Sequence, residues 1–287
     1  MKRSLHGLAL LTSLALGAAL SAARPPLAET ESIAAILSGL AERTQQYFDR
    51  FTSIICTETV HQQDLKFSLD AVGRPRQTVF ELSVMRDAKS KDGNDFRVER
   101  TLLSVNGKPA RKNQEPGCTD PKTGSPEPLE FLLAKHQAQF RFTVNDGATG
   151  GPAGTRALDF VQTPPDRVEI TWTGNCFDAE GGGQEGRVWF DRKTFDVIQI
   201  DARLPKPFLV PVPAGFFGIQ PPIRVERSEV VMRFSRVKFE KPDETVLLPE
   251  SIETLTVFRG VASLRTVQKL SNFRRFLAES TIRAIAR

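Results

Sequence analysis

Few residues in this chain are of the types that catalyse reactions, and none has a catalytic spacing. A serine hydrolase would have to use His61 or His136, and no G-x-S-x-G tract accompanies either residue. The carboxylates Asp191 and Asp196 flank a predicted turn, where charged residues are common. No C-x-x-C pair is present to bind zinc. We therefore expect no enzymatic activity, no metal site and no cofactor, and we interpret His136 as a partly buried helix residue.

The three cysteines point to one covalent link. Cys118 and Cys176 lie in Gly- and Pro-rich sequence that predicts loops, whereas Cys56 lies in a strand-like tract. Three pairings are possible, and cysteines of exported proteins tend to oxidise. We predict a Cys118–Cys176 disulfide, with Cys56 a buried thiol that packs like a small apolar residue.

Apolar residues are the better candidates for binding a ligand. Residues 204–222 (LPKPFLVPVPAGFFGIQPP) mix apolar side chains with prolines, which exclude an interior strand or a helix. Connecting loops are normally polar, so this insert either caps the core, covers an apolar pocket as a lid, or contacts a partner. The two tryptophans could equally be plain core residues. The expected ligand contacts are Trp172, Trp189, Phe208, Leu209, Val210, Phe216, Phe217 and Ile219.

Alternating apolar residues predict the strands that must carry these side chains. In residues 186–204 two such runs flank a short charged break, which predicts an antiparallel hairpin. Residues 223–240 change phase midway, which predicts a bulge or bend. Asn106-Gly107 predicts a tight turn. The other strand-like runs are 53–67, 78–90, 96–105, 139–145, 155–162, 167–173, 252–258 and 264–276.

Two helices are predicted. Residues 29–51 have an apolar stripe at helical spacing, with Thr30 as the expected N-cap. Ser125, as the expected N-cap, and the prolines after it predict the start of a second, short helix, in which Leu129, Leu132, Leu133 and His136 share a face.

The first residues resemble a secretory signal peptide. A basic start is followed by a 13-residue apolar run and small residues at 21–23. That run is well short of the ~20 residues that span a bilayer. We expect residues 1–23 to be the signal peptide and 24–287 a single domain, located in the periplasm or outside the cell, with no transmembrane segment. Loss of Lys2 and Arg3 lowers the net charge from +5 to +3, and no aromatic residues alternate with the basic ones, so we expect no nucleic-acid partner.

These elements predict a mainly β (α+β) fold. Consecutive hairpins form an antiparallel meander, and so wide a sheet must curl. We expect a large curved antiparallel sheet or half-barrel, with the N-terminal helix and the short inner helix packed on it. A β-sandwich is the competing fold.

Several tracts resemble the periplasmic lipoprotein-carrier (LolA-like) superfamily and exported bacterial proteins of unassigned role that are related to it. They are an N-terminal amphipathic helix followed by F-x-x-I-x-C-x-E, then GRVWFD…FDVIQIDARL, then LLPESIETLTVF…RTVQKLSNFRRF. The resemblance implies an antiparallel half-barrel closed by helices, whose cavity holds acyl chains of lipoproteins or other lipids. The 204–222 insert departs from that pattern, and no binding residue transfers position by position.

Two functions follow as expectations. The first is a non-catalytic exported protein that binds a lipid or a lipidated, hydrophobic ligand in an apolar cavity of the sheet. The second is a structural or interaction module of the cell envelope that docks a partner protein through the 204–222 loop. Protection of that loop from hydrogen exchange in the isolated protein distinguishes a lid from a docking surface.

Overall fold

The computed structural model describes residues 32–51, 53–86, 96–112, 114, 116–118, 124–165, 167–174, 176–213 and 223–275. Residues 1–31 lie outside these ranges. The predicted signal peptide therefore lies outside the described residues. So do three expected ligand contacts, Phe216, Phe217 and Ile219.

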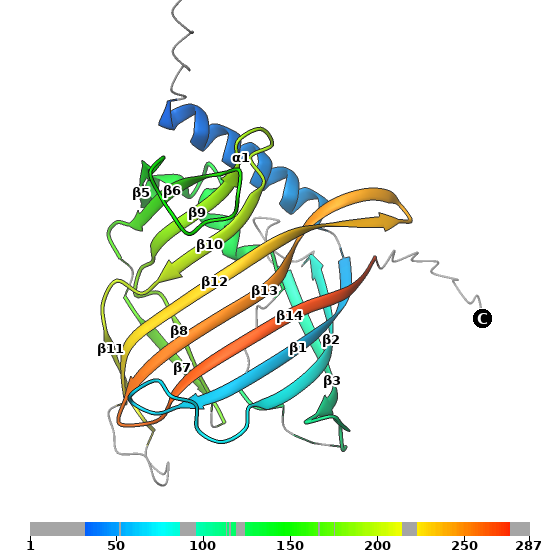
Figure 1. Cartoon of the computed structure of the whole chain (residues 1–287), viewed down its shortest axis with the longest axis vertical. Coiled ribbons are helices and arrows are strands. Elements are labelled where there is room, and N and C mark those ends of the chain that lie inside the picture. The colour runs from blue at the N-terminus through cyan, green and yellow to red at the C-terminus, as the bar shows by residue number, and fades with distance from the viewer. Residues whose placement is uncertain are drawn as a thin grey trace, which may run out of the picture. The chain divides into compact units, whose positions relative to one another are not determined.

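A curved antiparallel sheet of twelve strands dominates the structure and is not closed into a barrel (Figure 1). Its strand order is β4-β3-β2-β1-β14-β13-β12-β10-β9-β6-β5, and β11 pairs with β12 beside that path. A separate two-stranded sheet contains β7 and β8. The strands are β1 (Ser53–Leu65), β2 (Arg76–Arg86), β3 (Phe96–Val105), β4 (Lys108–Pro109), β5 (Phe140–Val144), β6 (Thr155–Gln162), β7 (Glu169–Thr173), β8 (Cys176–Glu180), β9 (Glu185–Asp191), β10 (Val197–Arg203), β11 (Phe208–Val210), β12 (Ile223–Glu240), β13 (Asp243–Arg259) and β14 (Ser263–Arg275).

The predicted mainly β fold with a curved sheet is confirmed, and so are its principal local features. The hairpin in residues 186–204 is β9–β10, paired in antiparallel register. Asn106 and Gly107 both have positive φ, as the tight turn requires. The phase change in β12 is also present, because Phe234 and Phe239 are both buried although they lie five positions apart, an odd number. The register shift against β13 lies ahead of both residues, between Arg233 and Phe234, and the pairing from Phe234 to Glu240 is continuous.

The N-terminal helix α1 (Ile33–Arg50) packs an aromatic stripe against the sheet. Tyr47 and Phe48 are buried, and Phe48 meets Phe96 of β3 edge-on at 5.8 Å between ring centroids. The N-cap is Ser32, whose hydroxyl accepts a hydrogen bond from the Ala35 amide at 3.2 Å. The expected cap Thr30 was therefore wrong, since the helix begins at Ile33, directly after a residue that can bond its first turn.

The predicted inner helix consists of two short 3₁₀ segments, η1 (Glu127–Leu132) and η2 (Gln137–Gln139). Pro126 occupies the N-cap position without a side-chain hydrogen bond, so the predicted capping by Ser125 was wrong. Leu129, Leu132 and Leu133 are buried together, as predicted. The two prolines that open the segment lack amide hydrogens, which favours a tight turn over a longer α-helix.

Two apolar clusters share one face of the sheet. The main core lies under α1 and η1, and includes Ile252 of β13. A second cluster lies at the other end of β13 and includes Phe258. These residues are an even number of positions apart on one strand, so both face the same side. The β7–β8 hairpin packs on the second cluster, and α1 packs on the first.

Candidate functional site

The second apolar cluster, here called the corner cluster, lies between the β7–β8 hairpin and the ends of β11, β12 and β13. Its buried members are Val210, Ile223 and Val225. Partly buried residues pack against them: Ile170, Trp172, Leu204, Phe208, Val212, Phe177, Phe258 and Val261. Incomplete burial of so many apolar side chains at the end of a sheet is typical of a surface that contacts a ligand or a partner.

Aromatic contacts connect the hairpin to the main sheet. The ring of Phe177 lies 5.4 Å from that of Trp172 and 6.2 Å from that of Phe258, measured between centroids. The Trp172 indole Nε1 donates a hydrogen bond to the Pro211 carbonyl at 2.9 Å. This bond holds β7 against the segment that follows β11.

The corner cluster contains three of the expected ligand contacts, and a fourth, Leu209, lies beside it without belonging to it. Trp172, Phe208 and Val210 belong to it, and Leu209 lies between the last two on β11 with 55% of its surface exposed. The pairing Phe208–Val225 and Val210–Ile223 makes β11 a short strand within the 204–222 insert. The prolines beside β11 do not interrupt the interior of the sheet, because β11 lies off its main path.

Trp189 is placed elsewhere. Its neighbours Val188 and Phe190 belong to the main core, so its ring faces the opposite side of the sheet. The indole Nε1 donates to Asp201 Oδ2 at 2.8 Å, and the Arg187 guanidinium lies 5.4 Å from the ring centroid. Trp189 therefore does not share a surface with Trp172.

The predicted Cys118–Cys176 disulfide is confirmed, with the two Cα atoms 5.3 Å apart. Cys176 is the first residue of β8, so the expectation that it lies in a loop was wrong. The Cys118 carbonyl accepts a hydrogen bond from Gln62 Nε2 of β1 at 2.7 Å. The disulfide thus fastens the hairpin to a segment that lies against β1, although the hairpin shares no backbone ladder with the main sheet.

The free cysteine, Cys56, lies on the same face of β1 as Glu58, which forms a buried ion pair with Arg100. Glu58 is fully buried and accepts hydrogen bonds from Arg100 Nε at 2.8 Å and from Gln268 Nε2 at 3.3 Å. Cys56 is buried, as predicted. Burial, reinforced by the charge of Glu58 and opposed by that of Arg100, raises the pKa of the Cys56 thiol to about 12. A thiol so hard to ionise is chemically inert at neutral pH.

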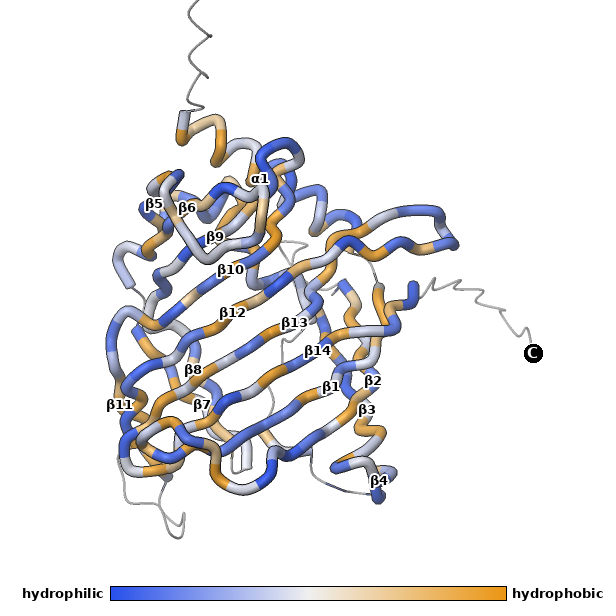
Figure 2. The backbone as a smooth tube through the Cα atoms, viewed as in Figure 1, coloured by the Kyte–Doolittle hydropathy of each residue, from blue (hydrophilic) through white to orange (hydrophobic). Residues whose placement is uncertain are grey.

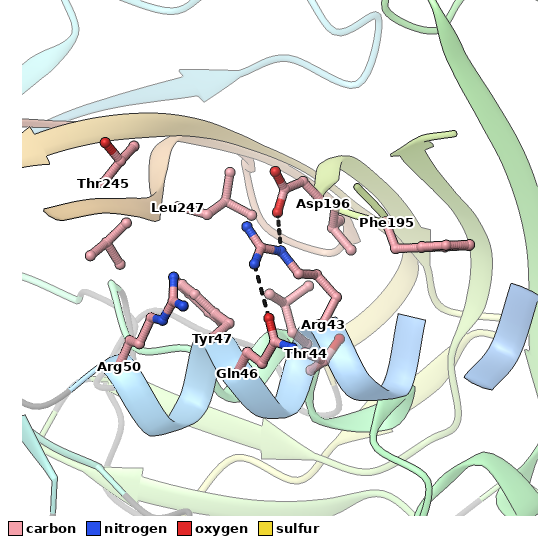
Figure 3. Close-up of a pocket in the computed structure, with 12 residues that line it drawn as sticks. Arg43, Thr44, Gln46, Tyr47, Arg50, Phe195, Asp196, Thr245 and Leu247 are labelled. Atoms are coloured by element: carbon pink, nitrogen blue, oxygen red, sulfur yellow. Dashed lines mark hydrogen bonds and ion pairs between the residues drawn. The ribbon is translucent and has the colours of Figure 1, made fainter. Parts of the chain in front are cut away.

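A small pocket lies between α1 and the turn that joins β9 to β10 (Figure 3). Arg43 of α1 and Arg236 of β12 both donate hydrogen bonds to Asp196, whose side chain is fully buried. Burial opposes ionisation of Asp196, but the two guanidinium groups outweigh it and hold the pKa of the carboxyl below its ordinary value. The hollow is about 20 Å³, which is close to the room that one water molecule needs and far below that of an acyl chain.

A second, open hollow of about 490 Å³ lies beside the β3–β4 turn. Lys108, Arg111 and Lys112 line it and are exposed. It is a basic surface rather than an apolar cavity.

Neither of the two described histidines is arranged as a catalytic base. His136 lies at the N-cap of η2 rather than within a helix, and its Nε2 is 2.9 Å from Glu130 Oε1 of η1. His61 Nε2 lies 3.2 Å from the side-chain amide of Gln77. Asp191 accepts hydrogen bonds from the backbone amides of Lys193 and Thr194 and so shapes its own turn.

Among the described residues, no group of three or more His, Cys, Asp or Glu side chains could hold a metal ion. Within the same ranges, none of the helices has the length and apolar character needed to cross a bilayer.

Sequence reasoning missed two features that the structure brings out. Asp196 was interpreted as a turn residue, yet it is the buried partner of two arginines. The loop between β1 and β2 was not singled out, yet it contains Phe67, the most exposed large apolar residue described. The tract KFSLDAV could have signalled it, because three large apolar residues occur there next to turn residues and charges.

Comparisons with known proteins give structural neighbours only. No protein-family model matches the chain, and no curated protein matches it. One similar solved structure is a domain described as an outer-membrane lipoprotein-sorting protein from Vibrio parahaemolyticus. It has 10% identity and a TM-score of 0.39, and the match covers 83% of this chain and 91% of that one. Another is a LolA superfamily protein from Nitrosomonas europaea, with 9% identity, a TM-score of 0.34, and coverage of 84% and 94%. These neighbours come from the superfamily that the sequence resembles, and both TM-scores are below 0.5.

Proposed function

We propose that this chain is an exported, non-catalytic binding protein that holds the acyl chain of a lipid or of a lipidated protein at the corner cluster. The observation that carries the proposal is the cluster itself, an apolar group separate from the main core whose aromatic rings are only partly covered. Burial of each methylene group of a ligand contributes about 0.8 kcal/mol and needs no specific polar contact. Such a site needs neither a metal ion nor a cofactor.

The β7–β8 hairpin is the element that would admit the ligand. It packs on the corner cluster through side chains and has no ladder with the main sheet, so moving it breaks no backbone pairing with that sheet. Gly181, Gly182 and Gly183 follow β8 with φ near +80°, a conformation that other residues rarely adopt. The Cys118–Cys176 disulfide keeps the hairpin tethered at its other end. An acyl chain would enter between the hairpin and the ends of β12 and β13.

The experiment uses the two tryptophans as reporters on opposite faces of the sheet. A polyene fatty acid that absorbs tryptophan emission is added to the mature protein carrying Trp189→Phe, which leaves Trp172 as the only donor. Quenching of Trp172 that excess unlabelled fatty acid reverses supports the proposal. The matched variant Trp172→Phe leaves Trp189 and should be quenched much less. Absence of quenching in the first variant, together with no lipid in native mass spectra, would refute acyl-chain binding.

Two phenylalanines provide a matched pair for affinity. Phe177 of β8 and Phe142 of β5 are both partly buried, one at the corner cluster and the other at the main core. Phe177→Ala should weaken binding of the probe by about tenfold or more, because a buried aromatic side chain contributes roughly 1.5–3 kcal/mol. Phe142→Ala should leave the affinity unchanged. Equal effects would indicate general destabilisation.

The alternative function is a module of the cell envelope that docks a partner protein through the 204–222 loop. The exposure of Leu209 on β11 favours it. Rapid hydrogen exchange in residues 204–213 of the isolated protein, slowed only by a partner, would support docking. Slow exchange in the isolated protein would support the binding site.

A further inference from the structure

The connection between β1 and β2, residues 66–75, exposes an unusual amount of apolar surface. Six large apolar side chains are exposed in the described part of the chain: Ile33, Phe67, Leu69, Val72, Leu103 and Leu209. Three of them belong to this ten-residue connection, here called the apolar loop. Phe67 is 87% exposed, which leaves almost the whole ring in water. An exposed cluster of this kind marks a contact surface more often than a chance exposure.

Hydrogen bonds fix the apolar loop in place. The Lys66 amide donates to the Asp70 carbonyl at 2.8 Å, and the Leu69 amide donates to the Lys66 carbonyl at 2.9 Å. The Val72 amide donates to the Asp64 carbonyl at 2.8 Å. Phe67 is therefore exposed on an ordered turn rather than on a frayed segment.

The backbone at Leu69 is strained. Its φ is +65°, in the left-handed region that disfavours side chains with a Cβ atom. Glycine or asparagine would adopt this conformation more easily. A leucine kept there with 39% of its surface exposed gains little from packing. Backbone strain that brings no packing benefit indicates that the Leu69 side chain contacts a binding partner.

Basic residues lie within the apolar loop and beside it. Lys66 and Arg74 lie within it and are exposed. The next connection at this end of the sheet supplies Lys108, Arg111 and Lys112, which line the open hollow of about 490 Å³.

Hydrogen bonds show that the two connections adjoin. The Gln77 amide donates to Asn106 Oδ1 at 2.9 Å, and the Asn106 amide donates to the Gln77 carbonyl at 2.8 Å. The nearby carboxylates are Asp70 of the apolar loop and Asp64, which precedes the last residue of β1. Against the five basic residues, they leave a surplus of three positive charges (5 − 2).

We propose that the apolar loop docks this end of the protein onto the surface of an anionic lipid bilayer. Phe67 and Leu69 would enter the boundary between headgroups and acyl chains, and the basic residues would contact the headgroups. The corner cluster opens at the same end, because the last residues of β1 pair with the first residues of β14, next to the end of β13. Docking does not depend on acyl-chain binding, and the two are measured separately.

The test is flotation of the full mature chain with two kinds of vesicle. One kind is phosphatidylcholine alone, and the other is an equal mixture of phosphatidylcholine and phosphatidylglycerol. We expect binding to the mixed vesicles that weakens as salt is added, and weaker binding to the neutral ones. Absence of binding to the mixed vesicles overturns the proposal. The apolar loop would then contact a protein partner.

Variants locate the contact. Phe67→Ser should weaken binding to the mixed vesicles by about tenfold or more, and Phe67→Trp should retain binding, with emission that shifts to the blue. Leu69→Ser has a matched control in Ile33→Ser, because both side chains are 39% exposed and Ile33 begins α1 at the opposite end of the sheet (Figure 1). The proposal requires a loss for Leu69→Ser and none for Ile33→Ser. Equal losses, or no loss for Phe67→Ser, overturn it.

Charge is tested with paired neutralisations. Lys66→Gln with Arg74→Gln should weaken binding by about thirtyfold, since each of the two basic residues near an anionic surface is worth about 1 kcal/mol. Arg192→Gln with Lys193→Gln removes two exposed charges from the β9–β10 turn, near α1, and should have no effect. The tube in Figure 2 shows the β1–β2 connection as a mixture of hydrophobic and hydrophilic segments, in keeping with both contacts. Equal effects of the two double variants would overturn the assignment to this end of the sheet.

Discussion

Arg43 of α1 donates a hydrogen bond from its guanidinium to the buried carboxylate of Asp196, 153 residues later in the chain. This ion pair joins the N-terminal helix to the β9–β10 turn. Arg236 of β12 contacts the other carboxylate oxygen, so three elements meet at one charged group. These two contacts hold α1 in its position over the sheet, so Asp196 has a structural role.

Removal of this carboxylate should destabilise the fold. Asp196→Ala leaves two arginines without their partner and should lower the free energy of unfolding by about 3 kcal/mol, near the low end for a broken buried pair because both arginines reach solvent. The control is Asp243→Ala, whose pair with Lys238 is mostly exposed and should contribute less than about 1 kcal/mol. Urea unfolding of the three proteins checks the difference, and similar midpoints would contradict it.

The Asp196 carboxylate should make part of the unfolding free energy sensitive to acid. Because the pKa of Asp196 is lowered in the folded state, its stabilisation is complete above the ordinary aspartate pKa of about 3.9 and is lost as pH falls through the lower folded value. The variant Asp196→Asn lacks this component. The gap in unfolding free energy between the wild type and Asp196→Asn should therefore be widest near neutral pH and shrink in acid. A constant gap would show that Asp196 does not titrate as described.

Alternation of side chains was sufficient to locate most strands, because it reports a local property of the backbone. Residues 96–105, 155–162 and 223–240 have the bounds that were predicted. Alternation could not predict which segment covers each face of the sheet, because this depends on contacts between segments that are distant in the sequence. The β7–β8 hairpin shows this clearly: β7 was predicted, but its partner β8 was interpreted as a loop because of the glycines that follow it.

The disulfide should contribute much of the stability of the corner cluster. Cys118 and Cys176 are 58 residues apart, and closing a loop of that size restricts the unfolded chain by about 4 kcal/mol in the entropic account. Replacement of both residues by alanine should lower the unfolding free energy by a large part of that amount. A decrease in unfolding free energy of less than about 1 kcal/mol would mean that the disulfide strains the native state, or that the unfolded chain without the disulfide is already compact.

Thiol counting tests the remaining cysteine. With a pKa raised to about 12 by burial, Cys56 should not react with an alkylating reagent in the folded protein near pH 8. Denaturant alone should expose one thiol, and denaturant with a reductant should expose all three. Rapid labelling of the native protein at Cys56 would show that the strand is more accessible than the structure indicates.

The candidate site was only partly predictable from the residues. Trp172, Phe208 and Val210 were found by their apolar character and do meet at one corner. Trp189 shares that character, yet it lies on the other face, because position within a strand decides which side a residue occupies. Asp196 and Phe67 were missed for the opposite reason: each has an environment that its residue type does not favour, and only the folded chain reveals it.

The cap of α1 gives a direct test of one corrected prediction. Ser32→Ala removes the hydroxyl that accepts from the Ala35 amide and should cost about 1 kcal/mol of stability. Thr30→Ala should cost much less, since Ser32 fills the capping position. Thermal unfolding followed by circular dichroism compares them. A larger effect at Thr30 would restore the cap expected from the sequence.

Leu69 and Phe195 share a left-handed backbone but differ in environment, so asparagine should act on them in opposite ways. Leu69 has φ +65° and is exposed, whereas Phe195 has φ +56° and stacks on Phe190, with 6.0 Å between ring centroids. Leu69→Asn should relieve backbone strain and leave stability unchanged or raise it by up to about 1 kcal/mol, while binding to anionic vesicles falls. Phe195→Asn relieves the same strain but removes a packed ring, so it should lower stability by about 3 kcal/mol. If Leu69→Asn instead destabilised the protein without weakening vesicle binding, Leu69 would be a packing residue, and the docking role of the apolar loop would have to rest on Phe67 alone.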